Sequence, residues 1–278
     1  MTELGAWEQY GARMSVRGNT RRQSHLNREL YSIEKHLPDS LSYTEAVVFP
    51  AEQSWNVPVG ELEKEFIQEV AIINSDNLNE KMIMAMPGEE IENGSLVHWM
   101  DQYWLVAEQD ANNTIYRRSK LLQCNYLLKW VTPEHEIIEQ WCAIEDGTKY
   151  LTGEYEDRTF FTNRGDSRIA ITIAKNSKTV KLGRKHRFLI DDLGGDQILA
   201  YALTKPLKFA GVYGGHGVYK FVLQEVNTTD DDNTELGIAD YYQHFLHEPD
   251  PNDDPILRPE PEEIPLVPEE GSGRRRWV

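Results

Sequence analysis

The chain of 278 residues is long enough for one large or two ordinary domains, and its apolar content of 40% is sufficient for a hydrophobic core. Its formal net charge of −17 disfavours the usual basic kind of nucleic-acid binder, because such a charge does not attract polyanions at long range. No apolar run approaches the roughly 18 to 20 residues of a membrane span, and the N-terminus lacks the apolar stretch of a secretory signal, so we expect a protein made in a cytosol without a membrane partner.

The first element in chain order is a helix near residues 20–36, inside a predicted N-terminal arm and helix of residues 1–38. Thr20 is placed to cap its N-terminus, and Pro38 ends the run. The apolar residues at helical spacing lie on one face and are Leu26, Leu30, Ile33 and Leu37. A single stripe on a short helix must be buried against something. Leu26, Leu30 and Ile33 are therefore candidate interface residues, packing either on the chain's own barrel or on a neighbouring subunit.

From Val70 onward the apolar pattern has the period of a β-strand. About ten short runs rich in β-branched and aromatic residues are separated by turn signals such as SDN, PGEE, ENGS and NRGD. This pattern is typical of an all-β sandwich or barrel, or of two such units joined end to end. Regular alternation of strands with helices is absent, which argues against Rossmann-type and TIM-type enzymes. The predicted fold class is mainly β: a β-barrel or sandwich with an N-terminal helix, a second, smaller module and an extended C-terminal arm.

Changes in strand length and composition divide the rest of the chain into three predicted parts. Residues 39–165 form a β-barrel-like domain, and a seam near 162–175 leads to a β-sandwich-like module at 166–227. Residues 228–278 form an acidic, extended arm, because fourteen acidic residues and one arginine occur between Thr228 and Glu270 and prolines interrupt the segment. Within this arm, ELGIADYYQHFL has a pattern that fits one or two helical turns.

Large aromatic side chains are concentrated between residues 94 and 130. The candidates for one aromatic wall are Trp99, Tyr103, Trp104, Tyr116, Tyr126 and Trp130. Strand alternation allows Trp99 and Tyr103 to share one face of a sheet, with Trp104 on the other. An exposed wall would be a platform for a carbohydrate or a nucleobase, whereas a buried wall would belong to a barrel or lie beneath a neighbouring subunit. We favour burial.

The sequence offers no recognisable catalytic, cofactor-binding or metal site. Cys124 and Cys142 lie in apolar strand contexts without a CxxC pair, so we interpret both as small buried hydrophobes. The eight histidines are scattered, and neither HExxH nor GxSxG occurs. GGHG at 214–217 precedes a strand, which is typical of a hairpin tip and not of a phosphate loop, and RGD at 164–166 fits a tight turn. The sequence predicts that the protein is not an enzyme and uses no cofactor.

The chain ends in GSGRRRWV, a basic and aromatic cluster after the acidic segment. Arginine and tryptophan are the residue types that most often anchor interfaces, since tryptophan fills a pocket and arginine makes bidentate contacts. The candidate anchors are Arg274, Arg275, Arg276 and Trp277. The alternative is a tail whose basic end has no partner.

Several blocks of the sequence resemble a family of virion structural proteins from tailed phages of Gram-positive hosts. These blocks are LPDSLSY (37–43), VAIINSDNLNEKMI (70–83), PGEEIENGSLVHWMDQYWLV (87–106), LLQCNYLLKW (121–130), EDGTKYLTGEYEDR (145–158) and FLIDD (188–192). The similarity runs over most of residues 20–245. Members of this family are placed at the neck of the virion, as head-closure or head-tail connector subunits, or are known only as phage structural proteins.

The resemblance implies a ring of identical subunits beneath the portal, with about twelve copies by symmetry matching and a β-barrel as the body. Such a ring would extend the portal channel, retain the packaged genome and dock the tail, with a portal or adaptor protein above it and tail proteins below. It would surround DNA without sequence-specific binding, and its location would be the virion neck after synthesis in the host cytoplasm. The family carries no catalytic motif, so no residue inherits a chemical role.

Other readings remain open at the level of sequence. A capsid decoration or tail structural protein would use the same β modules elsewhere on the virion. A carbohydrate-binding or receptor-binding module would expose its tryptophans. A cell-wall hydrolase would depend on one essential carboxylate.

Overall fold

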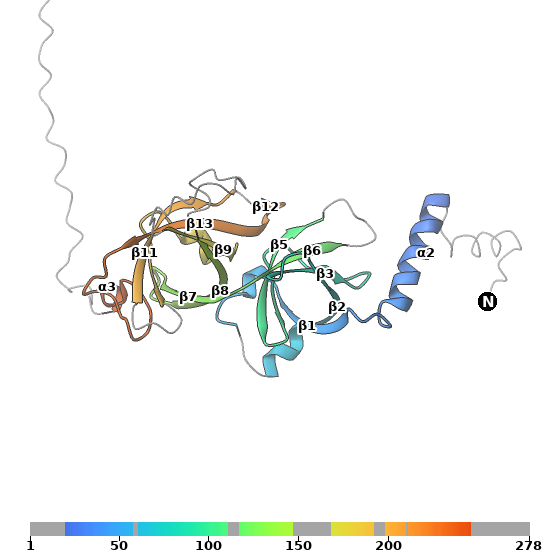
Figure 1. The fold of residues 1–278 in the computed structure, drawn as a ribbon, viewed down its shortest axis with the longest axis horizontal. Helices are drawn as coiled ribbons and strands as arrows, with labels where there is room; N and C mark the ends of the chain where they lie inside the picture. Colours follow the sequence, from blue (N-terminus) through green and yellow to red (C-terminus); the bar gives the residue numbers. More distant parts are fainter. Residues whose placement is uncertain are drawn as a thin grey trace, which may run out of the picture.

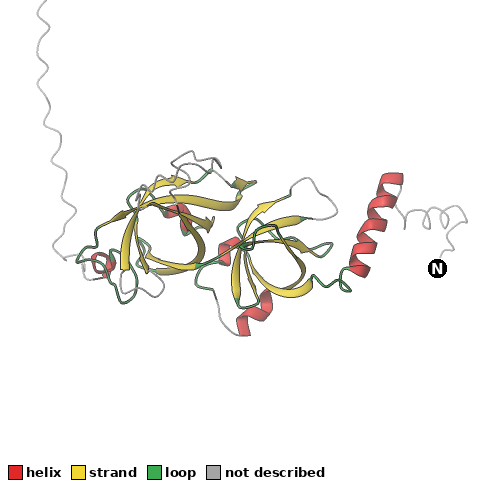
Figure 2. Ribbon diagram, in the orientation of Figure 1, coloured by secondary structure: helices red, strands yellow, loops and turns green. Residues whose placement is uncertain are grey.

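The computed structural model describes residues 20–57, 61–110, 117–146, 168–191, 198–209 and 211–245. Two barrel-like β units lie side by side along the long axis of the molecule, with helix α2 beyond one of them and the short helix α3 beyond the other (Figure 1). Figure 2 shows that strands make up most of both units. The mainly β fold with an N-terminal helix is therefore confirmed.

Helix α2 (Arg21–His36) forms where the helical periodicity predicted it. The side chain of Thr20 accepts a hydrogen bond from the backbone N–H of Gln23 at 3.1 Å, which satisfies one of the free donors of the first turn. The helix ends at His36, with Leu37 as the C-cap. None of its residues is buried, and the helix stands away from the barrel that follows it (Figure 1).

The first unit is a closed, antiparallel six-stranded barrel. Its strands, in spatial order, are β1 (Tyr43–Phe49), β2 (Ile67–Asn74), β3 (Glu80–Ala85), β6 (Arg118–Gln123), β5 (Gln102–Gln109) and β4 (Leu96–Trp99). Two 3-10 helices, η1 (Ala51–Gln53) and η2 (Glu61–Phe66), lie between β1 and β2. Alternate residues point inward, and Val70, Ile83, Val97, Val106 and Leu121 form the centre of the barrel core.

The second unit is a seven-stranded antiparallel sheet. It contains β10 (Arg187–Asp191), β11 (Ile198–Leu207), β13 (His216–Val226), β9 (Arg168–Ala174), β8 (Ile137–Asp146) and β7 (Tyr126–Val131), and β12 (Val212–Tyr213) pairs with β13. A further 3-10 helix, η4 (Thr179–Lys181), follows β9. The two ends of the main strand order meet, because the Tyr126 hydroxyl accepts a hydrogen bond from the backbone N–H of Asp191 at 2.9 Å. The enclosed core includes Trp130, Phe188 and Phe221.

Strand pairing divides the chain at a different point from the predicted boundary between 39–165 and 166–227. Strand β8 pairs with β9, so that Cys142 lies opposite Ile173, and β7 and β8 belong to the second unit. The first unit therefore ends at Gln123 and the second begins at Tyr126. Strand periodicity identifies single strands, but the pairing of strands far apart in the sequence depends on tertiary contacts that the local pattern does not contain.

The described part of the predicted C-terminal arm, 228–245, is folded and not extended. Ile238 and Ala239 are buried, and Ala239 packs on the second unit beside Leu189 and Ala200. A β-bridge joins Asn233 to Ile238, and the segment ends in α3 (Tyr241–Phe245). The rest of the arm, with residues 246–278, lies outside the described residues.

Two acidic residues of this folded segment are paired with Arg187 of β10. The guanidinium of Arg187 makes an ion pair with Asp232 at 2.7 Å and a second one with Asp240 at 2.5 Å. Asp232 also accepts hydrogen bonds from the backbone N–H groups of Thr229 and Asp240, at 2.7 and 2.9 Å. A carboxylate at 1% side-chain exposure is stable only with such partners, and the composition alone did not indicate them.

Candidate functional site

The two β units are joined by a buried apolar cluster of their own, distinct from the two barrel cores. Phe49, Leu96 and Leu105 come from the first barrel, and Ala174 and Val218 come from the second; all five are buried in one cluster. Strand β5 lies against β8 and β13 of the second unit. Burial of this kind resembles a domain core more than a contact between loosely tethered domains, so the units are fixed relative to each other.

A buried polar network crosses the same contact. Ser54, in the connection between β1 and β2, accepts hydrogen bonds from the side-chain amides of Gln140 at 3.2 Å and Asn176 at 3.4 Å. The Asn176 amide also donates to Gln140 at 3.0 Å, and all three residues are at most 1% exposed. Nearby, Asn56 exchanges hydrogen bonds with the backbone of Glu139 at 2.7 and 2.8 Å. Because Ser54 and Asn56 find these partners on the second unit, the network specifies one orientation of the two barrels.

The absence of a side chain at Gly94 allows the backbones of the two units to touch at Gly217. A Cβ atom on Gly94 would lie 2.3 Å from the carbonyl oxygen of Gly217, and Gly94 has a φ of +88°. Only glycine meets both conditions without moving the neighbouring chain. Gly217 lies in the GGHG motif, where β12 and β13 form the predicted hairpin and the side chain of His216 is 53% exposed.

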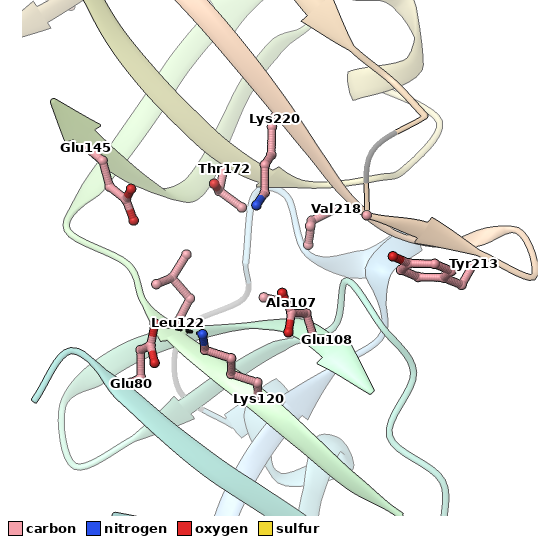
Figure 3. A pocket seen from close by; sticks show the side chains of 11 residues that line it. Glu80, Ala107, Glu108, Lys120, Leu122, Glu145, Thr172, Tyr213, Val218 and Lys220 are labelled. Carbon is pink, nitrogen blue, oxygen red and sulfur yellow. Dashed lines mark ion pairs between the residues drawn. The ribbon is translucent and has the colours of Figure 1, made fainter. Parts of the chain in front are cut away.

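Beside this contact, a groove of about 510 Å³ separates the outer surfaces of the two barrels (Figure 3). Its charged lining residues are Glu80, Glu108 and Lys120 from the first barrel and Glu145 and Lys220 from the second. The charges are mixed, and the described lining contains neither a thiol nor an imidazole. A wall of this kind suits contact with a polar surface.

Within the groove, Lys120 and Glu80 form an ion pair at 2.7 Å. The hydrogen bond from Lys120, with a second from Asn77, lowers the pKa of Glu80 below its ordinary value, although partial desolvation acts in the opposite direction. Glu80 is therefore ionised at neutral pH and is not held as a general acid.

The groove continues past Tyr213 into a hollow of about 730 Å³, which we call the acidic end of the groove. Its described lining is Glu90, Glu92, Asn93, Gln109, Asp110, Tyr213, Gly214 and His216. His216 Nδ1 lies 3.2 Å from Glu92 Oε2, and Arg117 is paired with Glu90. Asn93 is 5% exposed, and its Oδ1 atom is buried without a hydrogen-bond partner. Tyr213 is 68% exposed.

Burial shifts the pKa of three further titratable groups, Cys124, Cys142 and His186. Cys124 and Cys142 are buried and unpaired, as predicted, and desolvation raises the pKa of both thiols well above the ordinary value. His186 lies at a small cavity of about 100 Å³ near Trp130, and burial lowers its pKa to about 4. In the described ranges no group of three or more His, Cys, Asp or Glu side chains is placed to hold a metal ion. None of the helices in these ranges is long and apolar enough to cross a membrane.

The aromatic wall is largely buried. Trp104 and Trp130 are 4% and 2% exposed, Trp99, Tyr103 and Tyr126 are partly buried, and Tyr116 lies outside the described residues. Trp99 and Trp104 share a face and a core cluster, with ring centroids 6.4 Å apart, which corrects the predicted pairing of Trp99 with Tyr103. The reason is the turn after Trp99: Val97 pairs with Trp104 across the hairpin, and paired residues lie on the same face.

The structure describes only one of the two groups of predicted interface residues. Leu26, Leu30 and Ile33 lie on α2 with intermediate exposure, and no described residue buries them. The C-terminal cluster, Arg274, Arg275, Arg276 and Trp277, lies outside the described residues. Sequence reasoning did not identify the groove, because it arises from the contact between the two barrels. The local sequence features nearest to it are the glycines of ENGS and GGHG, where the two backbones approach each other.

Comparison with known proteins gives one family match. Residues 57–123 match the model of the YomX N-terminal domain, a phage-associated family of the Bacillus phage SPBeta type. The matched region is less than half of the chain, and it ends at the last residue of β6, where the first barrel ends. The match is consistent with a phage protein. No curated protein matches the chain.

Among solved structures, a chain of MrkH is similar over 74% of this chain and 86% of its own length, with 12% sequence identity and a TM-score of 0.21. MrkH is described as a novel c-di-GMP dependence transcription regulatory factor. At this TM-score the two folds do not superpose, so nothing about ligand or role is carried over.

Proposed function

We propose that the protein is a structural subunit of a phage virion neck, in which copies of the chain form a head-closure or head-tail connector ring. By symmetry matching the ring would hold about twelve copies. It would extend the portal channel, retain the packaged DNA and dock the tail, between a portal or adaptor protein and the tail proteins. The role is mechanical and needs no cofactor or chemical step.

The observation that carries this proposal is the uncovered apolar stripe of α2. Leu26, Leu30 and Ile33 share one face of a helix on which no residue is buried and which stands away from the chain's own barrel (Figure 1). An amphipathic helix of this kind is stable when its stripe is packed against another surface. A neighbouring copy that covers the stripe with its barrel would make a head-to-tail contact, and contacts of this type form rings when the rotation between copies closes.

Charge supports the same arrangement. Helix α2 carries four Lys or Arg residues against two Glu, whereas the whole chain has a net charge of −17. A basic helix is therefore attracted to the acidic body of another copy. The net negative charge also suits a channel wall that must hold DNA without binding its phosphates tightly. The YomX match supports a phage context without specifying a position in the virion.

Cryo-electron microscopy of the virion neck tests the location. The expected result is a ring of this chain beneath the portal, with α2 of each copy against its neighbour. Density for the chain on the capsid surface or along the tail would overturn the neck assignment and favour a decoration or tail protein.

The helix contact has its own test in the purified protein. Leu30→Asp places a charge within the stripe, while Ser32→Asp places the same charge on an exposed position of the same helix. Light scattering should show that assembly is lost with the first variant and kept with the second. Equal assembly of both variants would contradict a role for the stripe.

A further inference from the structure

The acidic end of the groove has three properties of a binding site for a basic, aromatic peptide segment. Its rim carries the carboxylates of Glu90, Glu92 and Asp110, which give it a negative charge. Asn93 brings a buried acceptor without a partner, and Tyr213 brings an exposed aromatic ring. An unpaired buried acceptor destabilises the fold, and a hydrogen-bond donor from a bound partner would offset that cost.

A metal ion does not fit these observations. In the part of the chain that the structure describes, the carboxylates here do not form a group of three positioned for a cation. Glu90 is already paired with Arg117, and Glu92 faces His216. Guanidinium groups fit better, because each spreads several N–H donors over a plane and can contact separate acceptors such as a carboxylate and an amide oxygen.

We propose that this end of the groove binds the C-terminal segment of the chain, Arg274 to Trp277. The arginines donate to Glu92, Asp110 and the unpaired Oδ1 of Asn93, and the Trp277 indole packs on the exposed ring of Tyr213. The inference does not depend on where in a virion the chain is located, because the groove and the segment both belong to this protein.

Chain length and charge both permit this contact. From Phe245, the last described residue, 33 residues lead to Val278, and an extended chain of that length spans up to roughly 110 Å. Between them the chain is acidic, so its basic end is the part that the negative groove attracts. Helix α2 is also basic, but it carries an apolar stripe, and Tyr213 is the one large apolar side chain in the described lining at this end.

Photo-crosslinking of the full-length protein tests the contact. With benzoylphenylalanine in place of Trp277, irradiation and peptide mass spectrometry should locate crosslinks at the 89–93 segment or the β12–β13 hairpin. The same probe in place of Tyr31, which is exposed on α2, is the matched control and should not label the groove. Crosslinks from position 277 to other surfaces, none at all, or labelling of the groove from position 31 alone would each overturn the proposal.

The charge requirement is tested separately. Glu92→Gln with Asp110→Asn should reduce the crosslink yield at least tenfold, whereas Asp39→Asn with Asp76→Asn removes the same charge from exposed positions and should leave the yield unchanged. Thermal melting of both variants checks that they fold. A labelled GSGRRRWV peptide added to protein shortened by residues 271–278 should bind at least tenfold more tightly than GSGAAAWV. Equal affinities of the two peptides would contradict the proposal even if a variant fails to fold.

Discussion

The ring of Tyr103 in β5 is stacked on the indole of Trp141 in β8, with centroids 4.5 Å apart and planes inclined by 16°. His98 is also stacked on Tyr103, at 4.6 Å. The Tyr103–Trp141 pair joins the first barrel to the second, so its loss should weaken the contact between the units as well as the local packing.

A double-mutant cycle measures this coupling. Tyr103→Ala and Trp141→Ala should each destabilise the protein, and the double variant should lose about 1 kcal/mol less than the sum of the two, as expected for an aromatic pair. Urea unfolding of the four proteins provides the values. Strictly additive losses would mean that the rings do not stabilise each other.

The close approach of Gly94 to Gly217 predicts an unusual cost for one methyl group. Gly94→Ala should destabilise the protein by more than about 2 kcal/mol, because the added Cβ overlaps a backbone carbonyl and also sits at a positive φ. Gly88→Ala is the control: it has a φ of +98° but open space around the added Cβ, so only the conformational cost of about 1 kcal/mol applies. Thermal melting compares the two, and similar losses would show that the inter-barrel contact is looser than described.

The burial of Trp104 predicts that it is a core residue and not part of an exposed platform. Trp104→Ala should cost about 3 to 5 kcal/mol in unfolding free energy. Trp99→Ala should cost less, since that side chain is only partly buried and donates one long hydrogen bond, 3.3 Å, to Thr44. Chemical denaturation of both variants checks the order, and an unchanged midpoint for the Trp104 variant would contradict the burial.

The Arg187–Asp232 pair predicts a pH-dependent stability of the folded segment 228–245. Desolvation acts to raise the pKa of Asp232, but the hydrogen bonds from Asp240 and Thr229 and the ion pair with Arg187 outweigh it and lower this pKa below the ordinary value. A carboxyl with a lowered folded-state pKa contributes stability above the unfolded-state pKa, near 3.9, and loses it as the pH falls through the folded-state value.

Asp232→Asn should therefore be less stable than the native protein at pH 7, and the difference should shrink as the pH falls below about 4. Hydrogen exchange of residues 228–245, together with melting curves across this range, measures it. Arg187→Ala should lower the unfolding free energy at pH 7 by about 3 to 5 kcal/mol relative to the native protein, because it leaves a buried carboxylate without its cation. A stability difference that is constant with pH would exclude the ion pair as its source.

Removal of the last eight residues, Gly271–Val278, should leave the monomer folded but weaken assembly. The expectation follows from the composition of GSGRRRWV, whose arginines and tryptophan suit an interface. Melting curves should still show one cooperative transition of a folded monomer, while virion yield and the occupancy of the proposed neck ring should fall. A truncated phage with normal yield and occupancy would rule out this role.

The sequence predicted those features that depend on local patterns. The stripe of α2, its Thr20 cap and the hairpin at GGHG follow from periodicity and turn chemistry, and the buried state of Trp104 and Trp130 follows from their place in strands. These signals act over a few residues, so they can be read without knowing the tertiary pairing.

Features that depend on distant partners could not be predicted in the same way. The boundary at Gln123 is set by the pairing of β8 with β9 across an intervening segment, and the folded state of 228–245 is set by Arg187, more than forty residues earlier in the sequence. The groove has the same origin, since Asn93 and Tyr213 lie about 120 residues apart. The acidic composition predicted an extended segment, because composition does not identify the cationic partner that folds 228–245.

The positions of α2 and α3 at opposite ends of the long axis have a mechanical consequence (Figure 1). A tension applied between the two ends of the described chain passes from α2 into β1, crosses the junction at Phe49 and Ser54, and leaves through the second sheet and the Arg187 anchor. At the junction, apolar packing and a buried amide network must both break before the two barrels separate, whereas the ion pair holds only the C-terminal segment to the second sheet. The described chain therefore responds to tension as one elongated rigid body, whose length is set by the two barrels along its long axis.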